Sequence, residues 1–83
     1  MRPVTPNPSA SIFHVRVDLP QAMDVRLEVF DTAGRRVGLL ADDLLPAGER
    51  EFSWDASGLS SGCYLVRLSG AGVCQTRRCV LLR

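Results

Sequence analysis

The sequence predicts an all-β fold, an antiparallel sandwich of about seven short strands. Hydrophobic and polar residues alternate along several segments, which is the period of a strand with one buried face. Turn-forming residues separate these segments about every 8–12 residues, and no segment shows the period of an amphipathic helix. Two sheets can bury their apolar faces against each other, and 83 residues suffice for one domain, so we expect a single sandwich.

The beginning of the chain reads as a linker, residues 1–10, followed by a domain at residues 11–83. Prolines at positions 3, 6 and 8 support this division, because proline lacks a backbone donor and favours extended geometry in the residue before it. The first two strands are expected at 13–19 and 24–30. Their outward-facing residues would be His14, Arg16, Asp18, Arg26 and Glu28.

Turn chemistry follows at residues 31–34, where Asp31 can bond the backbone ahead of it and Gly34 can adopt a positive φ. A short strand is expected at 35–40, then a loop at 42–45 and a second turn at 46–48. We interpret the adjacent carboxylates Asp42 and Asp43 as part of that solvated loop.

Three more strands are expected at 49–54, 63–69 and 73–82. A Ser- and Gly-rich loop at 55–62 precedes the second of them, and a tight turn at 70–72 precedes the third. Trp54 and Tyr64 are expected in the core, because each buries a large area, whereas Phe30 is the aromatic residue expected to face outward.

Ten basic and nine acidic residues give a net charge of +1, which argues against an electrostatic nucleic-acid binder. No apolar run approaches the roughly 20 residues that span a bilayer, so no membrane span is expected. The first residues lack the apolar region of a signal peptide. Composition therefore leaves two alternatives open, a cytoplasmic protein or the tail of a longer exported one.

The sequence holds little that could catalyse a reaction. His14 is the single histidine and no cysteine lies close to it in sequence, and two adjacent aspartates fall short of the six to eight oxygens of a calcium site. No paired acid and base or activated nucleophile emerges. We expect no enzyme activity, no metal and no cofactor.

Three cysteines lack the spacing of a zinc or redox motif. A three-residue turn at 70–72 would place Cys63 opposite Cys79, where a disulfide could form in an oxidising compartment, and buried free thiols are the alternative. The arginines Arg77, Arg78 and Arg83 also have two readings. They form a docking surface for a negatively charged partner, or their charge keeps an edge strand from aggregating.

Several short motifs occur in an order and spacing that can be compared with those of known families. They are Pro6-Asn7-Pro8, Leu19-Pro20, Val29-Phe30-Asp31, Gly34-Arg35-Arg36-Val37, Leu45-Pro46-Ala47-Gly48, Phe52-Ser53-Trp54-Asp55, Ser61-Gly62-Cys63-Tyr64, and a closing basic strand from Thr76 to Arg83. In this order and spacing the chain resembles the type A C-terminal sorting domain of type IX secretion cargo. It equally resembles the related immunoglobulin-like domain of the flagellar hook-capping protein.

The resemblance implies an immunoglobulin-like sandwich with a non-catalytic role at the end of a large exported protein. Its partners would be an outer-membrane secretion machinery and an upstream cargo domain, and its location the periplasm in transit, then the cell surface or the medium. Carried over position by position, the residues recognised by the machinery would be Gly34, Arg35, Arg36, Gly62, Tyr64, Arg77, Arg78 and Arg83.

Two rival functions remain open. One is a structural immunoglobulin-like interaction module, as in hook-capping or adhesive proteins, which would need no free C-terminus. The other is a small carbohydrate-binding domain, which would need exposed aromatic side chains on a sheet face.

Overall fold

A computed structural model describes residues 1–6 and 11–82. Within this part of the chain there is no helix, and so none that could cross a membrane. The strands are β1 (Ile12–Leu19), β2 (Met23–Asp31), β3 (Arg36–Leu45), β4 (Gly48–Asp55), β5 (Gly62–Gly70) and β6 (Val73–Leu81). The all-β prediction is confirmed, with six strands in the described residues rather than seven.

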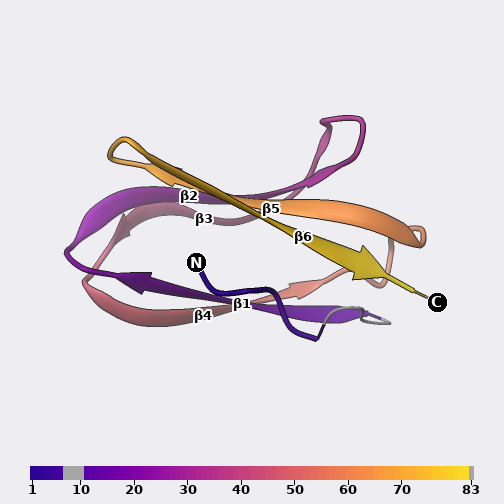
Figure 1. Cartoon of the computed structure of the whole chain (residues 1–83), viewed down its shortest axis with the longest axis horizontal. Helices are drawn as coiled ribbons and strands as arrows, with labels where there is room; N and C mark the ends of the chain where they lie inside the picture. The colour runs from indigo at the N-terminus through magenta and orange to yellow at the C-terminus, as the bar shows by residue number, and fades with distance from the viewer. Residues whose placement is uncertain (7–10, 83) are drawn as a thin grey trace.

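The strands form two antiparallel sheets that pack face to face (Figure 1). One sheet pairs β1 with β4, and the other has the order β3-β2-β5-β6. The β2–β3 and β5–β6 connections are hairpins within one sheet, whereas the other three connections cross from one sheet to the other. The buried faces of both sheets supply the core, which confirms the predicted sandwich.

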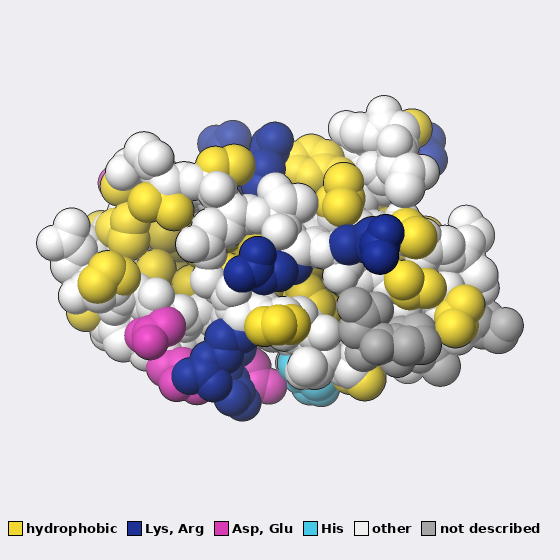
Figure 2. All heavy atoms as spheres, in the orientation of Figure 1, with side chains coloured by type: hydrophobic (Ala, Val, Ile, Leu, Met, Phe, Trp, Pro, Cys, Tyr) yellow, Lys and Arg dark blue, Asp and Glu magenta, His cyan; other side chains and the backbone are white. Residues whose placement is uncertain are grey.

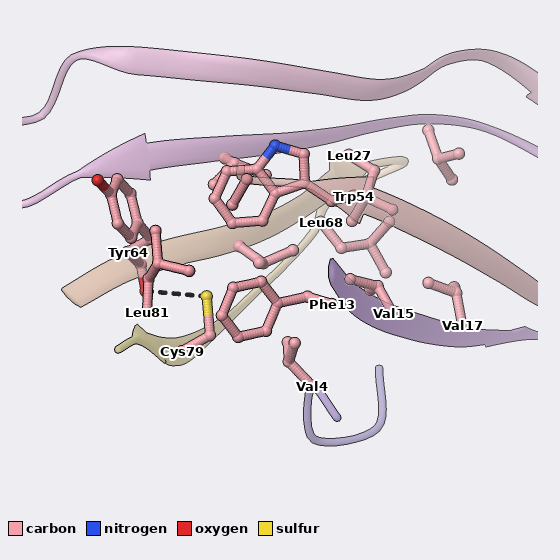
Figure 3. Close-up of a cluster of buried hydrophobic side chains, with 14 of the residues drawn as sticks. Val4, Phe13, Val15, Val17, Leu27, Trp54, Tyr64, Leu68, Cys79 and Leu81 are labelled. Atoms are coloured by element: carbon pink, nitrogen blue, oxygen red, sulfur yellow. Dashed lines mark hydrogen bonds between the residues drawn. The ribbon is translucent and has the colours of Figure 1, made fainter. Parts of the chain in front are cut away.

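An aromatic cluster lies at the centre of this core (Figure 3). Trp54 stacks on Phe13 with ring centroids 5.5 Å apart and meets the edge of Tyr64 at 5.6 Å. The Tyr64 hydroxyl donates a 2.6 Å hydrogen bond to the backbone carbonyl of Ser60, four residues upstream. A tyrosine at the start of the penultimate strand that bonds back in this way is the tyrosine corner of immunoglobulin-like sandwiches. Trp54 and Tyr64 both lie in the core, as the sequence predicts.

Strand β3 is longer than the sequence predicts. It continues through the residues expected as a loop at 42–45, and its pairing with β2 shifts register twice. Acidic residues fit here because β3 is an edge strand, where carboxylates reach water. Asp42 lies 3.6 Å from Arg26 on the neighbouring strand. The loop prediction at 42–45 was therefore wrong.

The residues before position 7 lie against the sandwich rather than apart from it. The Arg2 amide donates to the carbonyl of Arg16, and Thr5 forms an isolated bridge with His14. Between them, Val4 is only 2% exposed and belongs to the core. Part of the segment expected as a linker thus covers the open edge of β1, while residues 7–10 lie outside the described part.

The last hairpin corrects the expected cysteine pairing. Its turn has two residues, Ala71 and Gly72, both with positive φ, so Gly70 pairs with Val73. This register is one residue away from the expected one, and a slip of one residue moves a side chain to the other face. Cys63 consequently lies opposite Val80, Cys79 lies opposite Tyr64, and all three cysteines are free. The possible Cys63–Cys79 disulfide is therefore absent, and the alternative of three buried free thiols holds only for Cys79, because Cys63 and Cys74 are exposed.

Candidate functional site

One end of the sandwich brings together segments that are far apart in the sequence. The β2–β3 turn, the loop before β5 and the end of β6 meet there, since Gly62 pairs with Leu81 (Figure 1, right). We call it the β2–β3 end, defined by residues 31–35, 56–62 and 80–82. Three of the sequence motifs, including the Gly34-Arg35 and Ser61-Gly62 segments, contribute to it.

The β2–β3 turn is held in shape by Asp31. One carboxylate oxygen of Asp31 accepts hydrogen bonds from the backbone amides of Ala33 and Arg35, at 3.0 and 2.9 Å. The other oxygen accepts a 3.1 Å hydrogen bond from Nε of Arg35. These contacts, chiefly the backbone amide of Arg35, lower the pKa of the Asp31 carboxyl. Gly34 completes the turn at a φ of +84°, a conformation that favours glycine. The Arg35 side chain is 81% exposed, so a fixed turn presents it to solvent.

A hollow of about 250 Å³ lies between this turn and the start of β5. Arg35 and Val37 line one side, and Ser61, Gly62 and Cys63 line the other. Tyr64 also lines the hollow, but it is 6% exposed and fixed to Ser60, so it shapes the site from below. The hollow joins two of the segments that the sequence singles out.

Arg36 points to a different surface, the outer face of the four-stranded sheet. Its guanidinium lies 3.4 Å from Glu28, and Arg67 lies 3.3 Å from the other oxygen of the same carboxylate. Glu28 faces outward as predicted, yet it is only 4% exposed because these side chains surround it. Glu28 and Arg67 are not among the recognition residues predicted from the sequence. The register that makes them cross-strand neighbours would have revealed them, but it depends on β2 pairing with β5.

Adjacent arginines on β6 face opposite ways. Arg78 is opposite Leu65 on the outer face, whereas Arg77 is on the inner side, where it donates a 2.9 Å hydrogen bond to the carbonyl of Met1. Arg83 lies outside the described residues. The structure therefore separates the predicted recognition residues. Gly34, Arg35 and Gly62 are at the β2–β3 end, Arg36 and Arg78 are on the outer face, and Tyr64 and Arg77 point inward.

Comparison with known families identifies the family to which this chain belongs. The model of the secretion system C-terminal sorting domain matches residues 3–81, nearly the whole chain. The chain belongs to this family. Comparisons with curated proteins and with solved structures give no significant match. Membership agrees with the small all-β sandwich, and the match begins at residue 3, within the segment that packs against β1.

Proposed function

We propose that this sorting domain is a non-catalytic module that directs an attached upstream cargo through a type IX-like secretion system. The cargo would pass the periplasm and reach the cell surface or the medium. The observation that carries the proposal is the family match over residues 3–81. The gathering of separate motifs at the β2–β3 end supports it, because a machinery that reads a folded domain needs one continuous surface.

The geometry suits a rigid, folded signal. Asp31 fixes the β2–β3 turn and the tyrosine corner fixes the loop before β5, so the two walls of the hollow are ordered before any partner arrives. Preformed surfaces lose less conformational entropy on binding than flexible ones. Arg35 is then the exposed charge that a partner would meet first at this end.

The test is export of a fusion protein. Residues 1–83 are placed behind a signal peptide and a fluorescent reporter, in a bacterium with a working type IX system and in the same strain without its translocon. We expect fluorescence outside the cells only in the first strain. Point variants are preferable to deletion of β6, since that strand supplies Cys79 and Leu81 to the core and its removal would unfold the domain.

Two variants sharpen the result. Arg35→Glu reverses the exposed charge at the β2–β3 end and should reduce export several-fold, whereas Gln21→Glu, at the opposite end, should leave it unchanged. A third fusion carries a large tag after residue 83 and should not be exported. Export despite that tag, or equal export with and without the translocon, would contradict the sorting role and favour a structural interaction module.

A further inference from the structure

The first residues of the chain lie between the two sheets, with β1 on one side and β6 on the other (Figure 1). We call residues 1–5 the N-terminal strap. On the β1 side, Thr5 and His14 exchange two backbone hydrogen bonds, at 3.0 and 2.6 Å. The Arg2 amide donates a third, of 2.9 Å, to the carbonyl of Arg16. The strap is therefore fixed to the backbone of β1 at both of its ends.

Side chains fasten the strap to β6. The Arg77 guanidinium is half-buried, and its two terminal nitrogens donate to backbone carbonyls, 2.9 Å to Met1 and 3.3 Å to Thr76. Gln75 accepts a hydrogen bond from the backbone nitrogen of Met1, which remains a donor when a cargo is joined to it as a peptide. Because both terminal nitrogens of Arg77 are bonded within the chain, fastening explains its inward position better than contact with a negatively charged partner.

Ion pairs tie the strap to the two-stranded sheet as well. Arg2 lies 3.8 Å from one carboxylate oxygen of Glu49, and Arg16 lies 3.2 Å from the other. In the space-filling view, acidic and arginine side chains gather on the lower side of the molecule (Figure 2). These side chains are about half exposed, so water screens the pairs and each contributes little. The backbone hydrogen bonds, Arg77 and the buried Val4 therefore do most of the fastening.

The direction of the strap decides where a cargo leaves the domain. The strap runs antiparallel to β1, so its first residue points toward the β1–β2 turn. Met1 accordingly lines a hollow of about 230 Å³ together with Pro20 of that turn and Gly70 of the β5–β6 hairpin. Both connections lie at the end of the sandwich opposite the β2–β3 end. A cargo joined before residue 1 therefore emerges toward that opposite end.

Without the strap, a cargo would be held at the other end of the domain. Ser11 directly precedes β1, and its carbonyl accepts a 2.7 Å hydrogen bond from the amide of Ala56, which belongs to the β2–β3 end. A free ten-residue segment spans on average only about 17 Å. That is less than half of the 37 Å length of the domain. A cargo on a released strap would thus stay near the β2–β3 end.

We propose that the N-terminal strap holds the cargo away from the β2–β3 end, and that Arg77 is a positioning residue that acts through the strap. This rests on the proposed function and gives Arg77 a role other than direct recognition. The hollow between Arg35 and the start of β5 stays open to the secretion machinery only while no folded cargo stands beside it. Fastening of the strap provides that separation.

The position of the cargo is measured by energy transfer from a fluorescent reporter fused before residue 1. A dye on Cys63, in Cys74→Ser, reports on the β2–β3 end, and a dye on Cys74, in Cys63→Ser, reports on the opposite end. We expect stronger transfer to Cys74. Val4→Ser with Arg77→Gln releases the strap, and this preference should be lost. Arg26→Gln removes the same charge from an exposed position on β2 and should keep the preference.

Export of the same fusions tests the consequence for function. With the reporter joined directly to residue 1, we expect the released variant to be exported several-fold less than wild type. A flexible Gly-Ser spacer of about 20 residues before residue 1 should restore export to at least about half of wild type, because the cargo can then move away. A defect in folding or in recognition would not respond to a spacer. Arg77→Gln alone, which leaves Val4 in the core, guards against misfolding and should show the same response to a smaller degree.

The outcomes separate this role from the proposed function. Equal transfer to both cysteines in wild type, or an export defect that the spacer does not relieve, would overturn the positioning role of Arg77. If the released variant is exported like wild type, the strap does not position the cargo, while the sorting role stands. If the wild-type fusion itself is not exported, both proposals fail.

Discussion

The Arg77 guanidinium donates a 2.9 Å hydrogen bond to the backbone carbonyl of Met1, which fastens the start of the chain to its last strand. Arg77 is an inward-pointing charge on an edge strand, and Arg50, opposite the buried Val17, is another on β4. Such charges oppose pairing with a further strand. The two remaining edges are handled differently, since β3 changes register twice and residues 2–5 cover β1.

This arrangement predicts that the first residues are part of the stable domain. Val4→Ala should lower the free energy of unfolding by about 1–3 kcal/mol, because it removes buried methyl groups and leaves a cavity. Pro3→Ala, at an exposed neighbour, should change it by less than about 0.5 kcal/mol. Urea denaturation measures both. Equal midpoints for Val4→Ala and wild type would mean that this segment detaches in solution.

Some strands of this fold follow from local sequence patterns, whereas others depend on pairing that those patterns do not show. The alternation of hydrophobic and polar residues correctly predicted β1, β2 and the burial of Trp54 and Tyr64, because the two-residue period of a strand and its buried face can be recognised locally. It failed for Val4, which has only a short extended segment around it, and for β3, where the acidic pair Asp42-Asp43 resembles a loop. In both cases pairing with another strand decides the outcome, β1 for the segment around Val4 and β2 for β3.

The candidate site shows the same limit. The turn at Asp31 and Gly34 can be predicted from the local sequence, because both residue types favour turns. Glu28 and Arg67, by contrast, become neighbours only because β2 pairs with β5. The cysteine register depended on one residue of turn length, which the sequence Gly70-Ala71-Gly72 leaves ambiguous between a two- and a three-residue turn. Arg77 and Arg78 face opposite sides in any register, and this register decides that Arg77 is the one that faces inward.

The corrected register predicts the reactivity of the thiols. Cys63 and Cys74 are exposed, whereas Cys79 is buried with its thiol 3.6 Å from the Tyr64 carbonyl. Burial raises the pKa of the Cys79 thiol to about 11, with a smaller contribution from Cys63. A disulfide-exchange reagent at pH 8 should therefore modify two thiols quickly and the third only in denaturant. Titration of fewer than three thiols in denaturant, without added reductant, would reveal a disulfide.

The lowered pKa of Asp31 predicts an acid-dependent contribution to stability. A carboxyl whose pKa is lower in the folded state stabilises the fold above its unfolded pKa, ordinarily near 3.8, and loses that effect as pH falls through the folded value. Asp31→Asn should thus melt below wild type at pH 6, and the gap should shrink below pH 4. Thermal melts across this range provide the measurement. A gap independent of pH would show that the charge is immaterial.

Two glycines with positive φ should differ in how they tolerate a side chain. A Cβ at Gly34 would meet nothing within 4 Å, so Gly34→Ala carries only the backbone strain, about 1–2 kcal/mol. A Cβ at Gly70 would overlap the backbone carbonyl oxygen of Asp24 on β2. Gly70→Ala should therefore cost clearly more and shift the strands apart. If urea midpoints of the two variants agree, the hairpin has a different shape from the one described.

The deepest test of the core is Trp54, which is 6% exposed and packs between Phe13 and Tyr64. Trp54→Ala should remove about 3–5 kcal/mol from the free energy of unfolding, through lost burial and the cavity left behind. That is a large share of the total for so small a domain. Leu44→Ala, at a side chain that is 59% exposed, is the matched control and should change little. Urea melts that show less than about 1 kcal/mol lost in Trp54→Ala would place the ring at the surface and reverse the register of β4 against β1.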